Sequence, residues 1–174
     1  MQHKFLLLYA WLIRTLLFFL PDIPFIMRLR GRLYGFGMKR CGNNFQIAHS
    51  SIINGLDLCS IGRNVYIANT CNLILNGELT IGNEVIFGPG VLVSSGNHQF
   101  DGKSFRFSES RKEKVVIGDG CWIGGNSTIL GGANIPERSV VAAGSVVTKK
   151  SCQTIEGVYA GVPAKFIKQI KQIQ

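Results

Sequence analysis

An aliphatic residue recurs every six positions over a long stretch of this chain, and few features restrict a fold so strongly. From Ile117 the sequence divides into IGDGCW, IGGNST, ILGGAN, IPERSV, VAAGSV and VTKKSC, each opening with Ile or Val and each with a small residue in fifth place. A six-residue period matches neither the 3.6-residue turn of a helix nor the two-residue alternation of a long strand. The spacing predicts short strands that turn at regular corners and stack around a shared aliphatic column.

The same period occurs upstream, in blocks that open at Ile61, Ile67, Ile81, Phe87 and Val93. Two-residue insertions interrupt it between Ile53 and Ile61 and between Leu73 and Ile81. Glycine accounts for 21 of the 174 residues, and together with asparagine it can take the unusual dihedral angles of tight corners. A chain of this length is expected to form one domain, with no room for a second large catalytic domain.

The pattern resembles the hexapeptide-repeat acyltransferases, and the resemblance covers residues 45 to 167. It implies an all-β fold, a left-handed parallel β-helix with three hexapeptides per triangular coil. The expected organisation is an apolar and basic N-terminal segment at 1–44 with a helical stretch, the β-helix at 45–152 with an extruded loop at about 95–115, and a C-terminal tail with a short helix at 153–174. The resemblance also implies a homotrimer with active sites between neighbouring prisms.

The repeat breaks after Val93 and resumes near Ile117, which leaves an excursion that contains His98. A long loop inside a regular solenoid is usually functional. The motif GNH-x-x-D is similar to the loop of sugar O-acetyltransferases, where a histidine at this point is the general base. The distance from His98 to Trp122 also matches that of the galactoside and maltose acetyltransferases. The role of Asp101, whether it orients the imidazole, binds the acceptor or is simply solvated, stays open.

The resemblance also implies residues that bind acetyl-CoA, which would be a co-substrate. Trp122, Gly125 and Ala143 are expected along the groove for the pantetheine arm, and Thr148 and Lys149 near its nucleotide end. The closing sequence GVPAKFIKQI places Lys165 and Lys168 at positions where the family's basic residues meet CoA phosphates. Alternatively, both lysines fit the solvated face of a short amphipathic helix whose inward residues would be Phe166, Ile170 and Ile173. Asn72 lies near an acceptor-binding position of related enzymes.

The N-terminal segment combines an apolar run with most of the basic charge. Residues 5–20 read FLLLYAWLIRTLLFFL, too short as a helix to cross a bilayer and without a cleavage site after it. Residues 1 to 40 hold six units of the net charge of +9. Because Arg28, Arg30 and Arg32 follow the apolar run directly, we expect an in-plane anchor on an anionic membrane; the alternative is a helix packed on its own domain or on a partner subunit. Nucleic acid is not an expected partner, because the basic residues do not interleave with polar and stacking residues.

The five cysteines form neither a CxxC pair nor an even-numbered framework, so disulfides and a zinc site are not expected. Cys71 and Cys121 occupy small-residue positions of the repeat and are expected as buried free thiols in a reducing cytosol. A γ-class carbonic anhydrase would need three histidines, and only His49 and His98 lie in the repeat. No metal is therefore expected.

The resemblance implies a cytoplasmic, acetyl-CoA-dependent O-acetyltransferase similar to those of surface polysaccharide assembly, such as O-antigen or capsule, and the N-terminal segment predicts attachment at the cytoplasmic face of the inner membrane. Its acceptor would be a small-molecule or lipid-linked sugar. Two alternatives remain: a non-catalytic hexapeptide scaffold, and an N-acetyltransferase of an amino sugar. A serine acetyltransferase is disfavoured, because the large helical N-terminal domain of that class is absent from this sequence.

Overall fold

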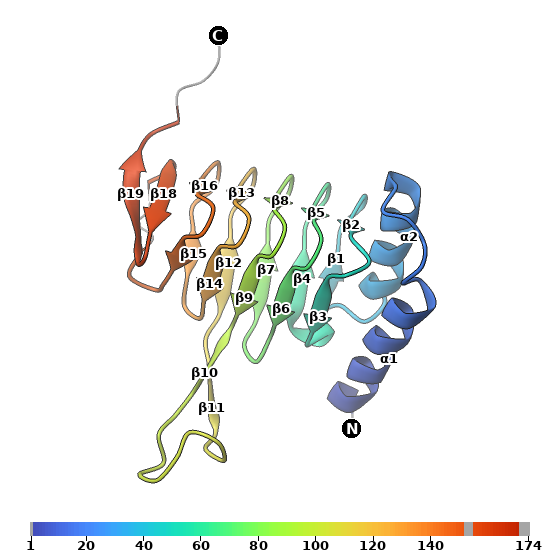
Figure 1. The fold of residues 1–174 in the computed structure, drawn as a ribbon, viewed down its shortest axis with the longest axis horizontal. Helices are drawn as coiled ribbons and strands as arrows, with labels where there is room; N and C mark the ends of the chain where they lie inside the picture. The colour runs from blue at the N-terminus through green and yellow to red at the C-terminus, as the bar shows by residue number, and fades with distance from the viewer. Residues whose placement is uncertain (1, 152–154, 171–174) are drawn as a thin grey trace.

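A computed structural model describes residues 2–151 and 155–170, and these build a triangular prism with helices across one end (Figure 1). Three parallel sheets form its faces, and β19 is the one antiparallel strand among them. Sheet A holds β1 (Arg40–Cys41), β4 (Cys59–Ile61), β7 (Leu79–Ile81), β12 (Val115–Ile117) and β15 (Asn134–Ile135). Sheet B holds β2 (Gln46–Ile47), β5 (Tyr66–Ile67), β8 (Ile86–Phe87), β13 (Trp122–Ile123), β16 (Val140–Val141), β18 (Val158–Gly161) and β19 (Ala164–Lys168). Sheet C holds β3 (Ile52–Asn54), β6 (Asn72–Ile74), β9 (Leu92–Ser94), β14 (Thr128–Leu130) and β17 (Val146–Val147).

The repeat produces this prism because one side chain of each short strand points to the common axis. In sheet A, for example, Ile61, Ile81, Ile117 and Ile135 stack in register and are buried. The corners need backbone that L residues rarely adopt: Asn44, Asn64, Glu84, Gly120 and Arg138 occupy equivalent corner positions, all with positive φ. The predicted parallel β-helix, of the left-handed type that the resemblance implies, is confirmed.

Helices α1 (Gln2–Leu16) and α2 (Pro24–Gly35) cover the N-terminal end of the prism. Ala10 and Ile13 of α1 are buried, and α1 contacts β3 and the 3-10 turn η1 (Leu56–Leu58). Helix α2 lies against β2, and it can approach so closely because a Cβ at Gly31 would stand 2.0 Å from the Phe45 carbonyl oxygen. Neither helix of the described chain is long and apolar enough to cross a membrane.

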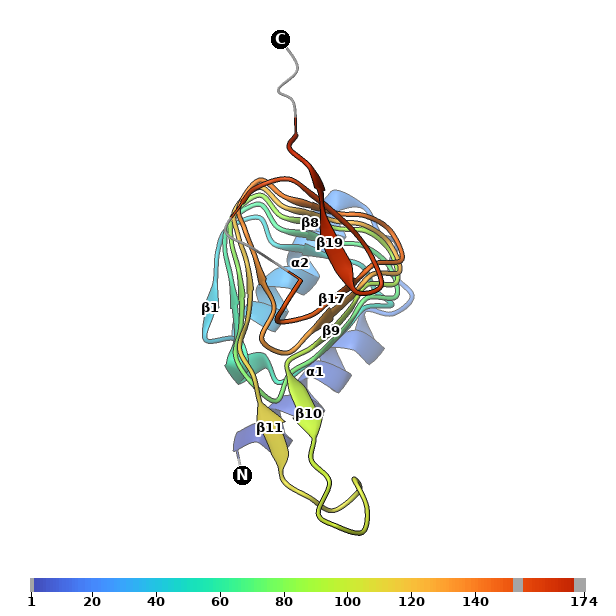
Figure 2. The ribbon, with the colours of Figure 1, turned by 90° about the vertical axis from the view of Figure 1, so that its left-hand side faces the viewer.

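The excursion is an antiparallel hairpin of β10 (Gly96–His98) and β11 (Ser110–Lys112). It leaves the prism after β9 of sheet C and returns before β12 of sheet A, so it projects from the corner between these sheets (Figure 2). Sheet B lies on the far side of the prism from this corner. That placement determines which candidate site residues one chain brings together.

The predicted C-terminal helix is wrong over the residues described. Ala164–Lys168 forms strand β19, paired antiparallel with β18 in sheet B. The edge of sheet B at β18 offers unpaired backbone groups that a returning strand can satisfy, and Phe166 packs edge-on against Tyr159 at 5.8 Å between ring centroids. Ile170 is exposed instead of facing inward, and Ile173 lies outside the described residues.

Four cysteines are free thiols: Cys59, Cys71 and Cys121 are buried and Cys41 is half-buried. Burial raises the pKa of Cys59 to about 12 and that of Cys121 to about 11, so both are protonated at neutral pH. Cys152 lies outside the described residues.

Candidate functional site

His98 ends strand β10 and is exposed on the projecting hairpin, opposite Ser110 in the strand register. Its imidazole has no hydrogen-bond partner among residues 2–151 and 155–170, so both ring nitrogens face solvent in the isolated chain. No neighbouring side chain of the described chain competes with a ligand for this imidazole. The hairpin therefore presents the one residue of the predicted site that could act as a general base.

The root of the hairpin is held by Ser95, which is fully buried. Its Oγ accepts the backbone N–H groups of Asn76 and Gly77 at 3.1 and 3.0 Å and donates to the Gly77 carbonyl at 2.7 Å. On the returning side, Glu113 donates its backbone N–H to the Ser95 carbonyl, and its carboxylate accepts the Asn97 side-chain amide at 2.9 Å. The position of His98 thus depends on a buried polar anchor in the prism.

Asp101 lies further out on the loop and does not hydrogen-bond to His98. Its carboxylate accepts the backbone N–H groups of Ser104 at 2.7 Å and Lys103 at 2.8 Å, and these bonds hold the pKa of Asp101 below its ordinary value. The two bonds close a turn in the loop. Of the roles left open for Asp101, this geometry favours ordering of the tip.

Trp122, Gly125 and Ala143 come together on sheet B and at the corner between sheets B and C. Trp122 is 54% exposed and stands in an outward row with Tyr66, Ile86 and Val140. Gly125 and Ala143 occupy equivalent places in successive coils after that row, and a Cβ at Gly125 would lie 3.0 Å from the Pro89 carbonyl. An exposed ring beside a corner of small residues leaves room for a long, thin ligand.

The remaining predicted residues fall into two further places. Thr148 and Lys149 follow β17 at the corner between sheets C and A, on the hairpin side, where the Lys149 stem lies against Gly132. Lys165 and Lys168 are exposed on β19 of sheet B. Asn72 lies on sheet C between Ile52 and Leu92, and its side chain donates to the Thr70 carbonyl at 3.1 Å.

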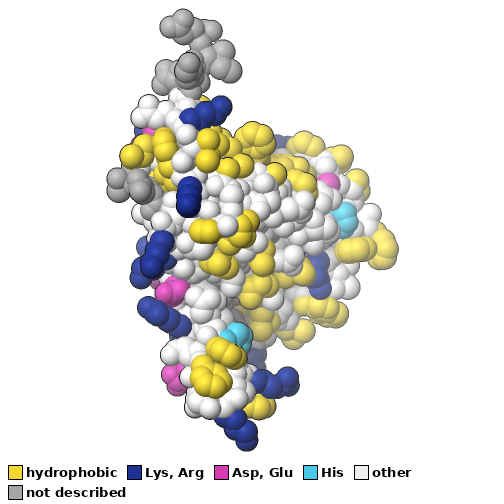
Figure 3. All heavy atoms as spheres, turned by 60° about the vertical axis from the view of Figure 1, so that its left-hand side comes forward, with side chains coloured by type: hydrophobic (Ala, Val, Ile, Leu, Met, Phe, Trp, Pro, Cys, Tyr) yellow, Lys and Arg dark blue, Asp and Glu magenta, His cyan; other side chains and the backbone are white. Residues whose placement is uncertain are grey.

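One chain does not unite these residues. His98, Thr148 and Lys149 belong to the corner between sheets C and A, whereas Trp122 and the two β19 lysines belong to the opposite face (Figure 2). Along the face that Figure 3 shows, hydrophobic side chains cover the middle of the coils, while basic side chains are spread around its margin, from the C-terminal end to the hairpin. The predicted site residues of one chain therefore occupy two separate surfaces.

Sequence reasoning missed a polar cluster that joins the helices to the first coil. Arg30 is 1% exposed and donates to Asp22 at 2.6 Å and to the Leu20 carbonyl at 2.6 Å. Asp22 also accepts the backbone N–H of His49 at 2.9 Å, and it lies 2.8 Å from His49 Nδ1. Although partial burial alone would raise the pKa of Asp22, the hydrogen bonds from His49 and Arg30 outweigh it and lower that pKa.

The prediction that Arg30 is one of the exposed basic residues of a membrane anchor is therefore wrong. Residues two apart on a helix point to nearly opposite sides, so Arg30 faces the prism while Arg28 and Arg32 face outward. The signal available in the sequence was Asp22, the only acidic residue among the first 56. Elsewhere, residues 2–151 and 155–170 contain no cluster of three or more His, Cys, Asp or Glu side chains placed to hold a metal ion.

Comparisons with known proteins agree with this architecture. The family model for the "hexapeptide repeat of succinyl-transferase" matches residues 114–149. The Saccharomyces cerevisiae protein YJL218W is 36% identical over 138 residues, which are 76% of this chain and 66% of that protein. The galactoside O-acetyltransferase of Escherichia coli is 34% identical over 110 residues, 63% of this chain and 53% of that enzyme. The chain thus spans about half to two thirds of the length of these curated relatives.

Solved structures extend the likeness to nearly the whole chain. A galactoside acetyltransferase in complex with coenzyme A superposes with a TM-score of 0.79 at 26% identity, over 97% of this chain and 82% of that one. A hexapeptide-repeat acetyltransferase from Vibrio cholerae, complexed with acetyl-CoA, has the same fold at a TM-score of 0.78 and 24% identity, over 97% of this chain and 89% of that one. The repeat, the fold and these similarities show that the chain belongs to the hexapeptide-repeat acetyltransferase family.

Proposed function

We propose that the protein is an acetyl-CoA-dependent O-acetyltransferase that acts on a sugar hydroxyl, with His98 as the general base. The observation that carries this proposal is the placement of His98: the solenoid is interrupted by one long hairpin, the buried Ser95 anchors its root, and its first strand ends at an exposed imidazole. The similarity to galactoside O-acetyltransferases supports a sugar hydroxyl as the acceptor.

The proposed reaction is a direct transfer. The acceptor hydroxyl oxygen attacks the thioester carbonyl carbon, His98 takes the hydroxyl proton, and a C–O bond forms. The C–S bond then breaks, and the proton passes to the departing CoA thiolate. Because the nucleophile belongs to the acceptor, no covalent enzyme intermediate is needed. Backbone N–H groups at a coil edge are the donors that we expect to stabilise the tetrahedral oxyanion.

A homotrimer is part of the proposal, with acetyl-CoA lying between the hairpin of one chain and sheet B of its neighbour. The outward side chains support this. The outward row of sheet B is mostly apolar, with Tyr66, Ile86, Trp122 and Val140 beside Gln46, whereas that of sheet A is mostly polar, with Arg40, Ser60, Thr80 and Asn134 beside Val116. An apolar face gains from burial against a second chain, and a polar face can stay in water. Lys165 and Lys168 would then meet CoA phosphates as point charges.

The acceptor in this proposal belongs to surface polysaccharide biosynthesis, such as that of O-antigen or capsule. Such acceptors ride on lipid carriers, and an enzyme held at the cytoplasmic face of the inner membrane meets them at a raised local concentration. Residues 1–44 would provide that attachment. Mass spectrometry of the cell's surface glycan with and without the gene tests the assignment, and an unchanged acetyl pattern would contradict it.

The role of His98 is tested by release of the CoA thiol in the presence of a sugar acceptor. General-base catalysis contributes about 100-fold or more, so His98→Ala should lower kcat by at least that factor. Its thermal unfolding should match the wild type, because the side chain is exposed. A folded His98→Ala protein with undiminished turnover would remove histidine base catalysis.

Mixed trimers test whether the site lies between chains. We expect His98→Ala and Ala143→Trp each to be inactive, the first for lack of the base and the second because the ring fills the corner. Random co-assembly would leave about one quarter of the sites with an intact His98 from one chain and an intact corner from the next. About a quarter of wild-type activity is therefore expected, and no recovery would refute the shared site.

A further inference from the structure

Helix α1 carries a second apolar face that nothing in the described chain covers. Its inward residues Ala10 and Ile13 pack on the prism. The opposite side, including the turn that follows the helix, is also apolar, at helical spacing, with Leu16 70% and Phe19 92% exposed; this stripe consists of Phe5, Leu8, Leu12, Leu16 and Phe19. A helix that is apolar on both sides needs a second apolar environment.

Helix α2 continues the same surface and adds positive charge. Its inward side is buried on the prism, and its outward side carries the exposed residues Phe25, Arg28, Leu29 and Arg32, with Phe36, 82% exposed, just after it. The two helices contact each other across the N-terminal end of the prism (Figure 1), so their exposed side chains belong to one surface. We call this combined surface the cap face.

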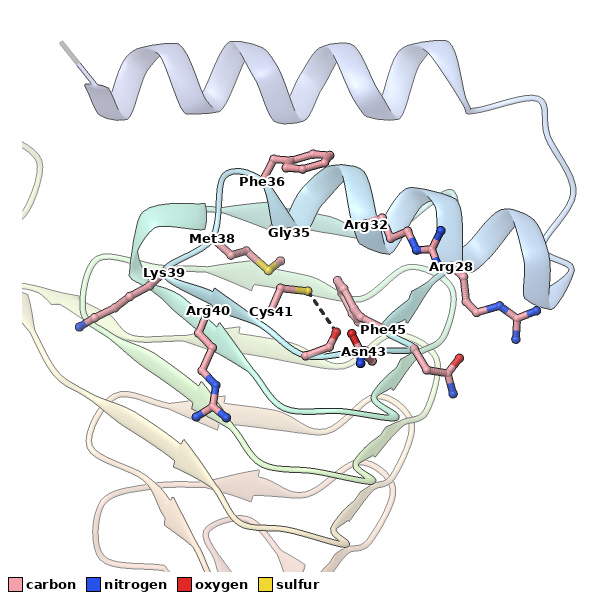
Figure 4. A pocket seen from close by; sticks show the side chains of 12 residues that line it. Arg28, Arg32, Gly35, Phe36, Met38, Lys39, Arg40, Cys41, Asn43 and Phe45 are labelled. Atoms are coloured by element: carbon pink, nitrogen blue, oxygen red, sulfur yellow. Dashed lines mark hydrogen bonds between the residues drawn. The ribbon is translucent and has the colours of Figure 1, made fainter.

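A pocket at the edge of the cap face is lined by cations and has a volume of about 710 Å³. Arg28 and Arg32 line it from α2 and Arg40 lines it from β1, and Figure 4 shows that Arg40 points over the coils, away from the other two. Within the described residues these three arginines form no ion pair, whereas nearby Lys39 is paired with Glu78 at 2.5 Å. The only acidic residue of positions 1–56, Asp22, is already engaged by the buried Arg30.

Charge decides what can cover the cap face. A second copy that met it face to face would bring unpaired arginines against one another without a carboxylate between them, which is unfavourable. An anionic bilayer offers both requirements, a plane of phosphates for the arginines and an apolar layer for the Phe and Leu side chains. At 15 residues, about 22 Å, α1 is suited to lie in the interface rather than to span it.

We infer that the cap face binds the surface of an anionic phospholipid bilayer, with α1 lying in the plane of the interface and Arg28 and Arg32 of α2 meeting lipid phosphates. The inference rests on the membrane location included in the proposed function, and it names the surface, the orientation and the headgroup chemistry. It does not depend on acetyl transfer. The prism then stands on the membrane through its N-terminal end, with β18 and β19 at the far end.

The test is sedimentation of the full chain with vesicles of phosphatidylcholine alone or with phosphatidylglycerol at about a third of the lipid. Binding is expected to the anionic vesicles only, and to weaken as NaCl is raised. The double variant Arg28→Gln/Arg32→Gln should bind about 30-fold more weakly, since each basic residue near such a surface contributes about five-fold. The matched control Lys103→Gln/Lys150→Gln removes the same charge from exposed positions on the hairpin and after β17, and it should bind almost as the wild type does.

A second pair of variants separates the apolar contribution from charge. Phe19→Ser should weaken vesicle binding several-fold, whereas Val162→Ser, also exposed but at the far end, should not. The inference is overturned if both double variants bind equally, if neutral vesicles bind as well, or if Phe19→Ser changes the oligomeric state rather than vesicle binding. Thiol release by the same proteins distinguishes the two proposals: an inactive chain that binds anionic vesicles refutes the enzyme alone, and an active chain that ignores them refutes this inference alone.

Discussion

Replacing the buried Arg30 tests whether the helices are held to the prism by the polar cluster that links them. In Arg30→Met the alkyl chain is largely kept, and the guanidinium bonds to Asp22, to the Leu20 carbonyl and to the Ile47 carbonyl at 3.2 Å are lost. Removing one partner of a buried ion pair costs about 3–5 kcal/mol. We expect the lower end, about 3 kcal/mol, because Asp22 keeps its bonds from His49 and Asn69 and its side chain is 20% exposed.

The matched control is Arg32→Met, two residues along the same helix but on its exposed side. Urea unfolding should give an unfolding free energy for Arg32→Met within about 0.5 kcal/mol of the wild type. Hydrogen exchange should show lost protection in α2 of Arg30→Met while the strands of sheets A to C keep theirs, because the cluster holds the helices and not the coils. Equal unfolding free energies for the two variants would refute the reasoning.

The loss of unfolding free energy caused by Arg30→Met should also depend on pH, and the pKa of Asp22 determines in which direction. The pKa of Asp22 is lowered in the folded protein, so the carboxylate contributes stability that is present above its unfolded pKa of about 4 and is lost as the pH falls through the folded value. The difference between wild type and Arg30→Met should therefore shrink below about pH 4. A difference that stays constant down to pH 2 would show that the ion pair is not its source.

Two further predictions follow from buried groups. Ser95→Ala removes three hydrogen bonds at the hairpin root, so it should cost about 2–3 kcal/mol of stability and lower thiol release. The control Ser94→Ala removes one bond of 3.3 Å and should change neither property. Equal unfolding curves for the two variants would contradict this prediction. Burial raises the pKa of Cys59 to about 12 and that of Cys121 to about 11, so above about pH 8.5 these thiols ionise only in the unfolded protein. The unfolding free energy should therefore fall by about 1.4 kcal/mol per pH unit for each thiol. Urea denaturation at pH 8 and pH 10 measures this fall, and equal unfolding free energies at the two pH values would contradict the prediction.

The prism was predictable because the repeat is local. Each six-residue block specifies one inward residue and one corner, so Ile117, Ile123 and Ile129 could be recognised as core without knowing which strands pair. The long break in the period marked the hairpin in the same way. The family resemblance then supplied the handedness, which the spacing alone does not contain.

Two predictions failed because the spacing of residues within a segment does not show what that segment contacts in the fold. The tail around Phe166 has helical spacing of apolar residues, but it turns back directly after β18 and pairs with the open edge of sheet B as a strand. Arg30 was read as a surface cation because its partners Asp22 and Ile47 are 8 and 17 residues away.

The two ends of the hairpin enter and leave the prism one hydrogen bond apart, through the Glu113 amide and the Ser95 carbonyl at 2.9 Å. An insertion that closes on itself in this manner leaves the rungs above and below in unchanged register. Residues between His98 and Lys112 can therefore change in length or sequence without shifting the coils, and under the proposed mechanism such changes would alter which acceptor reaches His98 while leaving the prism unchanged.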